Sequence, residues 1–407
     1  MTATGDGWLA ALRRGDWLDG ERTRVYGRML LLFYAVITVA WLALSHAGLD
    51  LTGNPLGPDF LNVYAAGRMV NEGRPAAVYD WPQHAAVETE VLPHAGYYGW
   101  HYPPPFLALA APLARLPYLG ALAVYSALTL VLYGLSVLVL LDERGWRLRG
   151  DALVLTLAFP AAFINFGHGQ NGFLTAALLT GGLGLLDRRP WLAGVLIGLL
   201  AYKPQFGLLI PVALLAAGAW AAIAAAAVTV LATTALSAWV FGLDAWFAFV
   251  QSWQLTRTVI LEQGATGWEK IVSLFSAARG LGAPLAVAYG VQALGAVLAA
   301  LAVALLWYRS ADQRLRIASL ALALPLGTPY VLDYDLTVLM PAIAALALAG
   351  LEGGFRPWRK LLLALVFFMP LVSRQIGLLT HLPVMQAAVL ALFVSVVREG
   401  LAYRRTL

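Results

Sequence analysis

Long runs without charged residues limit what this chain can fold into more than any other feature of its sequence. Seven such runs lie at 30–45, 119–141, 152–186, 205–243, 284–308, 317–332 and 375–397. A helix needs about 20 apolar residues to cross the hydrocarbon core of a bilayer, so several runs hold one crossing and the two longest hold a pair. Only 12% of the residues are charged and 60% are hydrophobic, which is too little charge to cover a soluble surface. The sequence therefore predicts an all-α integral membrane protein.

The distribution of basic residues indicates the orientation. With the N-terminus in the cytoplasm, we predict about twelve crossings (eleven to thirteen) and both chain ends inside. They lie at 28–48, 119–141, 151–166, 171–186, 190–202, 205–217, 219–241, 284–308, 314–330, 333–349, 359–379 and 384–402. Nineteen of the 27 Lys and Arg residues then face the cytoplasm, as the positive-inside rule expects. The net charge of +5 is thus a topology signal, and no nucleic-acid partner is expected. We predict a single polytopic domain, 1–407, in the inner (plasma) membrane.

The segments outside these crossings also have an expected place. Residues 1–27 form a cytoplasmic segment without a cleavable signal peptide, and 6–24 is predicted to be an amphipathic helix on the inner leaflet. Residues 49–118 form the first external loop, in which 103–116 is too short to span and is predicted to be a re-entrant or interfacial helix. Between 165 and 171 a polar stretch predicts a tight turn between two short helices. The chain has no Cys, so disulfides and thiolate metal sites are excluded.

Most of the unusual polar residues fall on the predicted outer side. Asp59 follows the first crossing within Gly-Pro-Asp-Phe (57–60), and a carboxylate just outside the membrane suggests chemistry on a lipid-linked substrate. Segments far apart in the sequence converge there, as they do in the pockets of helical membrane proteins. The candidate binding residues that accompany Asp59 are Tyr64, His101, Tyr102, His168, Gln170, Asn171, Lys203, Gln205, Arg257, Tyr330, Asp333, Asp335 and Arg374.

Several candidates also have a purely structural interpretation. Asp59 is a favoured residue for capping a helix that begins near Phe60. Lys203 is the only charged residue between Pro190 and Phe241, and such a lysine often snorkels to the interface. The Pro that follows it, and the short flanking helices, favour a break that faces the protein interior instead. The two remaining alternatives are that His168 and Gln170 only satisfy loop carbonyls and that Arg374 pairs with Asp333 or Asp335.

The order of the motifs resembles glycosyltransferase family 87. These are polytopic enzymes of the GT-C class, and they include polyprenol-phosphate-mannose-dependent α-mannosyltransferases. The resemblance spans residues 28 to about 345. The matching pieces are Asp59-Phe60, Tyr64 to Gly67, Gly73 to Asp80, Tyr102 to Phe106, Ala111 to Pro117, Gly169 to Asn171, Ala193-Gly194, Lys203 to Gln205 and Thr328 to Tyr330.

The resemblance implies a GT-C fold and a mechanism. A carboxylate in the first external loop acts there as general base on the acceptor hydroxyl, and the sugar leaves a lipid phosphate with inversion; Asp59 matches that carboxylate. Lys203 matches a basic residue near the donor phosphate. Because there is no pyrophosphate to neutralise, Lys203 with Arg257 or Arg374 replaces a divalent ion, and no metal or other cofactor is expected. The chain departs from the family at 328–335, where some members carry a histidine.

The function predicted from these features is a membrane glycosyltransferase that uses a polyprenyl-phosphate sugar. Mannose is the family default, and the acceptor is a glycolipid or a cell-envelope glycan, with the active site facing the periplasm or exterior. A transporter or flippase of a lipid-linked sugar is the alternative, since it also needs intramembrane basic residues that face a cavity. Sugar transfer by purified protein in detergent, without a sealed vesicle, distinguishes the two.

Overall fold

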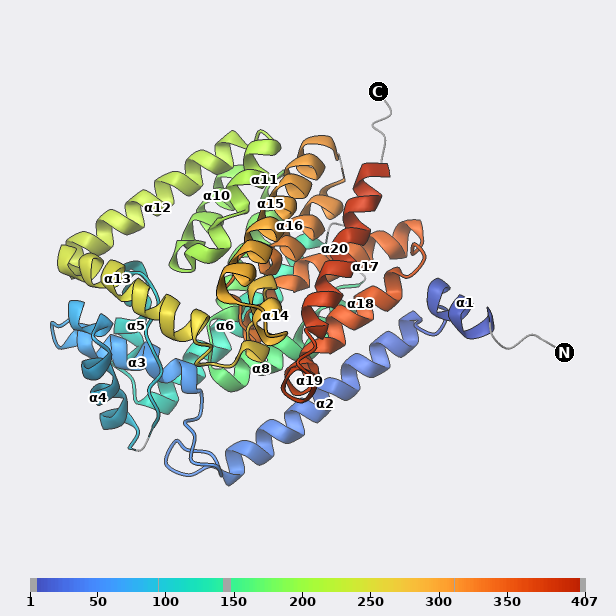
Figure 1. The fold of residues 1–407 in the computed structure, drawn as a ribbon. Helices are drawn as coiled ribbons and strands as arrows, with labels where there is room; N and C mark the ends of the chain where they lie inside the picture. Colours follow the sequence, from blue (N-terminus) through green and yellow to red (C-terminus); the bar gives the residue numbers. More distant parts are fainter. Residues whose placement is uncertain (1–5, 94, 142–147, 311, 403–407) are drawn as a thin grey trace.

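The structure is a computed structural model that describes residues 6–93, 95–141, 148–310 and 312–402 (Figure 1). These residues form helices and a few isolated β-bridges, and they contain no β-strand. The α-helices are α1 Asp6–Arg14, α2 Gly20–Leu44, α3 Pro58–Asn71, α4 Trp81–Val91, α5 Leu107–Leu113, α6 Tyr118–Leu140, α7 Arg149–Ala158, α8 Pro160–His168, α9 Gly172–Leu185, α10 Pro190–Leu199, α11 Ile210–Ala216, α12 Trp220–Phe241, α13 Leu243–Thr256, α14 Leu274–Gly280, α15 Leu285–Arg309, α16 Gln313–Gly327, α17 Met340–Gly353, α18 Arg359–Phe368, α19 Ser373–Thr380 and α20 Val384–Ala402. The all-α prediction is confirmed.

Short 3-10 and π-helical segments join many of these helices. They are η1 Ala76–Tyr79, η2 Pro104–Phe106, η4 Leu200–Tyr202, η5 Pro204–Gly207, η6 Arg257–Glu262, η7 Trp268–Lys270, η8 Asp333–Leu339 and η9 Met369–Leu371. Four of them have proline at one of their first two positions or just before them, where the missing N–H leaves no helical hydrogen bond unmade. Because short helices of this kind interrupt the long ones, the chain can place polar side chains inside a largely apolar bundle.

The number of full-length spans is lower than the twelve predicted. In the described part of the chain, six helices are long and apolar enough to cross a membrane, and there are up to eight if each of two bent helix pairs counts as one span. The first pair, α7 and α8, bends by 55° where Pro160 begins α8, and the second pair bends by 73° before α19. The predicted spans 171–186, 190–202 and 205–217 coincide with shorter apolar helices.

The N-terminal segment also differs from its prediction. A single amphipathic helix was expected over 6–24, but α1 ends at Arg14 and α2 already begins at Gly20. Gly15 has a φ of 75°, which ends the first helix, and the Asp19 carboxylate caps the second by accepting from the N–H of Arg22 at 2.8 Å. The first spanning helix is therefore 25 residues long and begins before residue 28.

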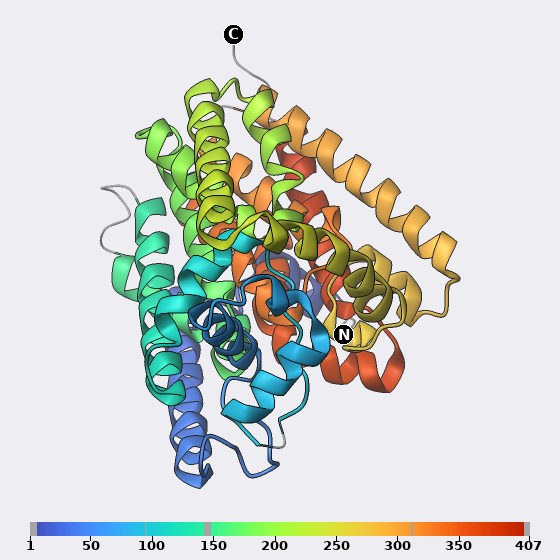
Figure 2. The same cartoon turned by 90° about the vertical axis from the view of Figure 1, so that its left-hand side faces the viewer.

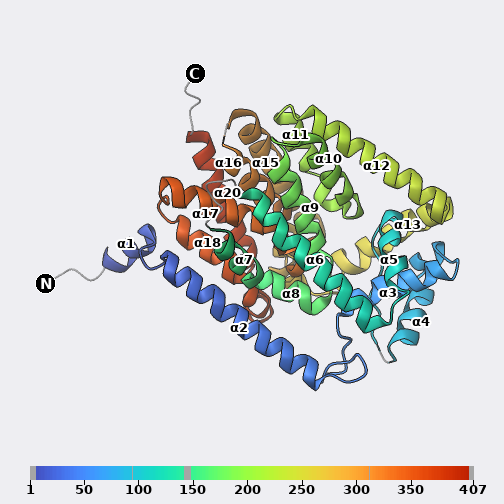
Figure 3. The same cartoon turned by 180° about the vertical axis from the view of Figure 1, so that it is seen from behind.

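The spanning helices differ in how much of their surface the protein covers. In the most apolar stretch of each helix, 11% of the residues of α2 and 17% of those of α12 are buried. The corresponding share in the Asp333–Gly353 span is 61%. Figure 3 shows α2 along one edge of the molecule, and Figure 2 shows α15 at another edge. A peripheral helix with an apolar outer surface suits contact with lipid, while the central span is enclosed by its neighbours.

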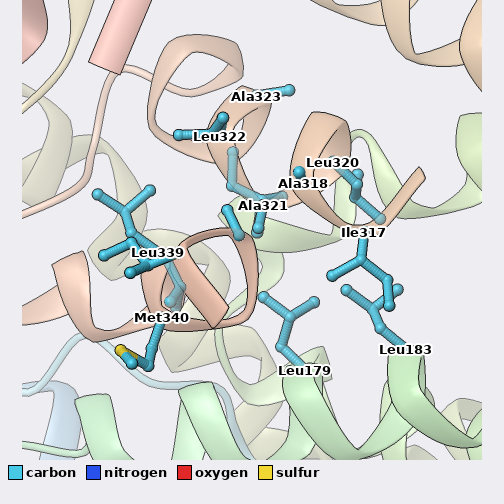
Figure 4. Close-up of a cluster of buried hydrophobic side chains, with 14 of the residues drawn as sticks. Leu179, Leu183, Ile317, Ala318, Leu320, Ala321, Leu322, Ala323, Leu339 and Met340 are labelled. Atoms are coloured by element: carbon cyan, nitrogen blue, oxygen red, sulfur yellow. The ribbon is translucent and has the colours of Figure 1, made fainter. Parts of the chain in front are cut away.

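The main hydrophobic core surrounds α16. Every residue from Ile317 to Gly327 is buried, so this helix is apolar on all sides and has neighbours on all sides. Figure 4 shows side chains of α16 close to those of Leu179 and Leu183 on α9 and to those of Leu339, which ends η8, and Met340, which begins α17. This core fixes the position of η8, which carries Asp333 and Asp335 into the centre of the protein.

A second core forms within the segment that precedes α6. It joins α3, α4, α5 and the first turns of α6, and it includes Tyr202 and Ala245 from later in the chain. Helices α3 and α5 approach so closely that a Cβ on Gly67 would lie 2.2 Å from the carbonyl oxygen of Ala110, so only glycine fits there. In Figure 1, α13 crosses over the group formed by α3, α4 and α5. The region between the two cores is where the polar residues meet.

Candidate functional site

A cavity of about 610 Å³ lies where the two cores meet. Its wall is formed by α3, the segment 97–102, the turn after α8, the break between η4 and η5, α13 with η6, and the segments that lead to Lys270 and Asp335. The predicted site residues that line it are Asp59, His101, Tyr102, Gln170, Lys203, Gln205, Arg257, Tyr330 and Asp335. The convergence of distant segments that the sequence predicted is thus present in the structure.

Asp59 lies in the first turn of α3 and faces this cavity. Its helix begins at Pro58, and the N-cap is Gly57 with a φ of 68°, so the alternative that Asp59 caps the helix is wrong. Its carboxylate is 16% exposed, and one oxygen, Oδ2, lies 3.4 Å from Nε2 of Gln170 and 3.4 Å from Nδ1 of His168. Burial raises the pKa of Asp59, and the positive charge of Lys270 and the amide of Gln170 partly offset that rise.

The carboxamide of Gln170 has a fixed orientation. Its oxygen accepts from the hydroxyl of Tyr102 at 2.9 Å and from the N–H of Asn171 at 2.7 Å. Both donors require an acceptor, so the oxygen faces them and the amino group faces Asp59. Gln170 is 4% exposed, which leaves it no room to turn toward water. It therefore acts as a rigid support for the carboxylate.

The turn that carries Gln170 follows from local sequence. Gly169 ends α8 in the left-handed conformation with a φ of 61°, and the side chain of Asn165 accepts from the N–H of Gly172 at 2.8 Å to begin α9. A Cβ on Gly169 would lie 2.8 Å from Cβ of Phe60, so this glycine also lets the turn approach α3. The tight turn predicted between two short helices is confirmed, and it sets Gln170 beside Asp59.

Lys203 lies in the predicted break, between η4 and η5, and it is 3% exposed. Its ammonium group donates to a carboxylate oxygen of Asp335, while the other oxygen of Asp335 accepts from the N–H of Leu332 at 3.2 Å. Snorkelling to the interface is therefore wrong for this lysine. The charge of Lys203 is instead balanced by a buried carboxylate from η8.

Lys270 is a cavity residue that the site prediction left out. It ends η7, and its ammonium group lies 5.5 Å from the ring centre of Tyr334, another lining residue that was not predicted. The isolated bridge between Ile271 and Leu332 brings these two segments together. A lone lysine in a loop gives little signal in the sequence, since its partner lies 64 positions further along the chain.

His101 and its neighbours form an aromatic wall. Nδ1 of His101 lies 2.9 Å from the hydroxyl of Thr256 on α13, and the ring packs edge-on against Trp81. Burial lowers the pKa of His101 to about 4, so the imidazole is neutral at pH 7 and suits a hydrogen bond to an uncharged group. Tyr97, Tyr98 and Trp253 complete this side of the cavity.

Five predicted residues do not line the cavity. The hydroxyl of Tyr64 donates to the carbonyl oxygen of Leu116 at 2.8 Å, which links α3 to the segment between α5 and α6. Asn171 is fully buried behind Gln170, and the backbone N–H of Tyr334 donates to the carboxylate of Asp333 at 2.9 Å. His168 lies outside the lining, and its Nδ1 is 3.4 Å from Oδ2 of Asp59. These four and Arg374 therefore surround the site rather than form its surface.

The structural alternatives for His168 and Arg374 are not borne out either. Nδ1 of His168 makes no hydrogen bond within the described residues and faces the Asp59 carboxylate instead of a loop carbonyl. No ion pair joins Arg374 to Asp333 or Asp335 in the described chain, and Asp335 is held by Lys203. His168 therefore belongs to the surroundings of Asp59.

The fold and the cavity together define a multi-pass helical membrane protein with a cavity of the size that binds small molecules, in which charged and polar side chains lie within a largely apolar lining. The chain belongs to glycosyltransferase family 87, whose family model matches residues 100–331, more than half of its length. It is therefore a membrane glycosyltransferase. The matched region includes Lys203 and Lys270 but begins after Asp59. No curated protein and no solved structure matched the chain.

Proposed function

We propose that this glycosyltransferase transfers a sugar, with mannose as the family default, from a polyprenyl-phosphate donor to a glycolipid or cell-envelope glycan, with Asp59 as general base. The observation that carries the proposal is that Asp59 lines one cavity together with basic side chains, Lys270 among them. A carboxylate suits the deprotonation of an acceptor hydroxyl, and cations suit a leaving phosphate. The GT-C fold and the outward-facing site that the motif resemblance implies belong to the same proposal.

The environment of Asp59 supports its role as base. A general base works best when its pKa lies near the operating pH, and burial raises the pKa of Asp59 from its ordinary low value. Gln170 and His168 both approach the same oxygen, Oδ2, at 3.4 Å. Among the described residues no hydrogen bond engages the other oxygen, Oδ1, so it is available to accept the proton of an acceptor hydroxyl.

The lining of the cavity supports a lipid-linked donor. Leu208 and Trp253 both belong to the lining, yet Leu208 is 56% exposed and Trp253 is 59% exposed. The apolar surface of the cavity therefore continues onto the outside of the helical bundle, where lipid surrounds a membrane protein. A donor with its polar head in the cavity and its isoprenoid chain along Leu208 and Trp253 leaves the chain in an apolar environment.

The proposed reaction is a single displacement. The acceptor oxygen forms a bond to the anomeric carbon of the sugar as the bond from that carbon to the phosphate oxygen breaks. The electron pair of the broken bond stays on the phosphate, and the acceptor proton passes to the carboxylate of Asp59, which later releases it to water. The products are the glycosylated acceptor and polyprenyl phosphate, and the configuration at the anomeric carbon inverts.

Transport of a lipid-linked sugar is the alternative function, and a transfer assay in detergent separates the two. Membership of a glycosyltransferase family supports the enzyme. Purified protein with polyprenyl-phosphate mannose and an extract of cell-envelope glycolipids is expected to form a glycosylated product without a sealed compartment. Absence of transfer to any acceptor in detergent, together with movement of the donor between the leaflets of sealed vesicles, would favour the transporter.

A further inference from the structure

The charges that line the cavity are not equivalent. Lys203 is paired with Asp335, and Nε of Arg257 lies 2.9 Å from a carboxylate oxygen of Glu262. Lys270 forms no ion pair with any carboxylate among the described residues. Of the cations in the lining, it is therefore the one whose charge is left for a ligand.

The position of Lys270 is set by the fold. The N–H of Val272 donates to the carbonyl oxygen of Val331 at 2.6 Å, next to the bridge between Ile271 and Leu332. These contacts hold Lys270 against the segment that leads into η8, and its ammonium group rests over the ring of Tyr334 at 5.5 Å. A cation on an aromatic face is positioned without being neutralised, since the ring carries no net charge.

Lys270 also lies on the same part of the wall as the proposed base. The ring of Tyr334, on which it rests, is 5.6 Å from the ring of His168, and His168 lies 3.4 Å from the carboxylate of Asp59. The chain of contacts from Lys270 through Tyr334 and His168 to Asp59 places the free cation near the base but not against it. Consistent with this, the charge of Lys270 lowers the pKa of Asp59 more than any other charge does.

We propose that Lys270 binds the anionic phosphate of the lipid-linked donor and stabilises the charge that forms on it. The Lys203–Asp335 pair is then a structural part of the cavity wall. This assignment rests on the proposed function. It replaces Lys203 as the phosphate ligand, because a phosphate at Lys203 would compete with a buried carboxylate that is already bonded to it.

The charge on the phosphate changes during the proposed reaction, and this predicts how Lys270 acts. The donor is a phosphodiester with one negative charge, and the leaving polyprenyl phosphate carries up to two. A cation beside it gains interaction energy as the bond breaks, so it stabilises the transition state more than the bound donor. Loss of Lys270 should therefore lower kcat more than it raises KM.

Binding of the bare lipid tests the proposal without the reaction. Purified protein in nanodiscs is titrated with geranylgeranyl phosphate and with uncharged geranylgeraniol, and the quenching of tryptophan fluorescence reports binding. We expect the wild type to prefer the phosphate, Lys270→Gln to lose that preference by roughly 10- to 100-fold, and Lys270→Arg to keep most of it. The double variant Lys203→Gln/Asp335→Asn, which removes no net charge, is expected to keep the preference.

The controls distinguish a failure of the role proposed for Lys270 from a failure of the proposed phosphate donor. Arg188→Gln removes one positive charge from an exposed site remote from the cavity and should bind both lipids as the wild type does. A Lys270→Gln protein with an unchanged melting temperature and an unchanged preference for the phosphate would overturn the role of Lys270 and leave the donor class intact. A wild type that binds both lipids equally would overturn the phosphate donor and with it this role of Lys270.

Discussion

Gln170 directs its amide nitrogen at the carboxylate of Asp59, and two other residues hold it in that orientation. Tyr102 and the N–H of Asn171 both donate to its oxygen, at 2.9 and 2.7 Å. The nitrogen reaches Asp59 from 111 positions away in the sequence. A carboxylate that is supported in this way keeps one orientation toward the cavity, as a general base must to meet a hydroxyl in a reactive geometry.

Asp59→Asn tests the base directly. The substitution keeps the shape of the side chain but removes its capacity to take a proton, so turnover should fall by roughly 10²- to 10⁴-fold. Binding of the donor should survive, because the lysines of the cavity are untouched. Radiolabelled sugar transfer by the purified variant measures the first effect, and equilibrium binding of polyprenyl-phosphate mannose measures the second.

Asp80→Asn is the matched control for this experiment. Asp80 caps α4 by accepting from the N–H of Gln83 at 3.1 Å, and Asn caps a helix about as well. Its variant should transfer sugar at nearly the wild-type rate. If Asp59→Asn behaves in the same way, Asp59 has a structural role, and the base must be sought elsewhere in the cavity.

The pH dependence of kcat/KM should show the effect of Gln170 on the pKa of Asp59. Burial raises the pKa of Asp59, and the amide of Gln170 lowers it because a hydrogen bond favours the ionised form. Gln170→Leu removes that bond, so the pKa of Asp59 rises further and a larger part of the enzyme is protonated and inactive at a given pH. The acid limb of kcat/KM should therefore move to higher pH. An acid limb that stays in place, or moves to lower pH, would contradict this coupling.

Gln205→Leu provides the comparison for this shift. Gln205 is the other glutamine in the lining, and no hydrogen bond joins it to Asp59 within the described residues. Its substitution leaves the acid limb where it is in the wild type, whatever it does to the rate. A shift of equal size in both variants would point to a general change in the polarity of the cavity.

Features of the site that depend on neighbouring residues were predictable from sequence. Gly169 and the polar residues around it predict a turn, and Pro204 after Lys203 predicts a break between short helices. Both predictions hold because a positive φ and a missing N–H act within a few residues. The charge-free runs likewise predict helices that cross a membrane, although their length does not show where Pro160 bends one of them.

Features that depend on pairing between distant segments were not predictable. Lys203 meets Asp335 across 132 positions, and Lys270 rests on Tyr334 because a bridge between Ile271 and Leu332 aligns their segments. No local pattern marks these partners, since each is set by how η8 packs against the core around α16. The sequence therefore predicted Lys203 near the donor phosphate without its partner Asp335, and it left Lys270 outside the predicted site.

Cysteine labelling tests which side of the membrane the cavity faces. The chain has no native Cys, so a single introduced thiol reports on its own position. Asn54 and Arg188 are both exposed, and they lie on opposite sides in the predicted topology. Asn54→Cys should react with a membrane-impermeant thiol reagent in intact spheroplasts, whereas Arg188→Cys should react only after the membrane is opened. The reverse pattern would invert the orientation and place the site in the cytoplasm.

Loss of one member of the Lys203–Asp335 pair should destabilise the folded protein. Lys203 is 3% exposed and Asp335 is 1% exposed, so loss of either partner leaves the other charge buried without compensation. Lys203→Gln and Asp335→Asn should each lower the free energy of unfolding by about 3–5 kcal/mol, as is common when one member of a buried pair is removed. Unfolding in increasing denaturing detergent, followed by tryptophan fluorescence, measures these changes.

The double variant distinguishes a structural pair from two independent residues. Lys203→Gln/Asp335→Asn removes both charges, so no unpaired charge remains, and its loss of stability should be clearly smaller than the sum of the two single losses. Its two uncharged side chains can still hydrogen-bond to each other, and this preserves the contact between η8 and the break that follows η4. Strictly additive losses would mean that the two residues act separately, and Lys203 would then again be free to bind the donor phosphate.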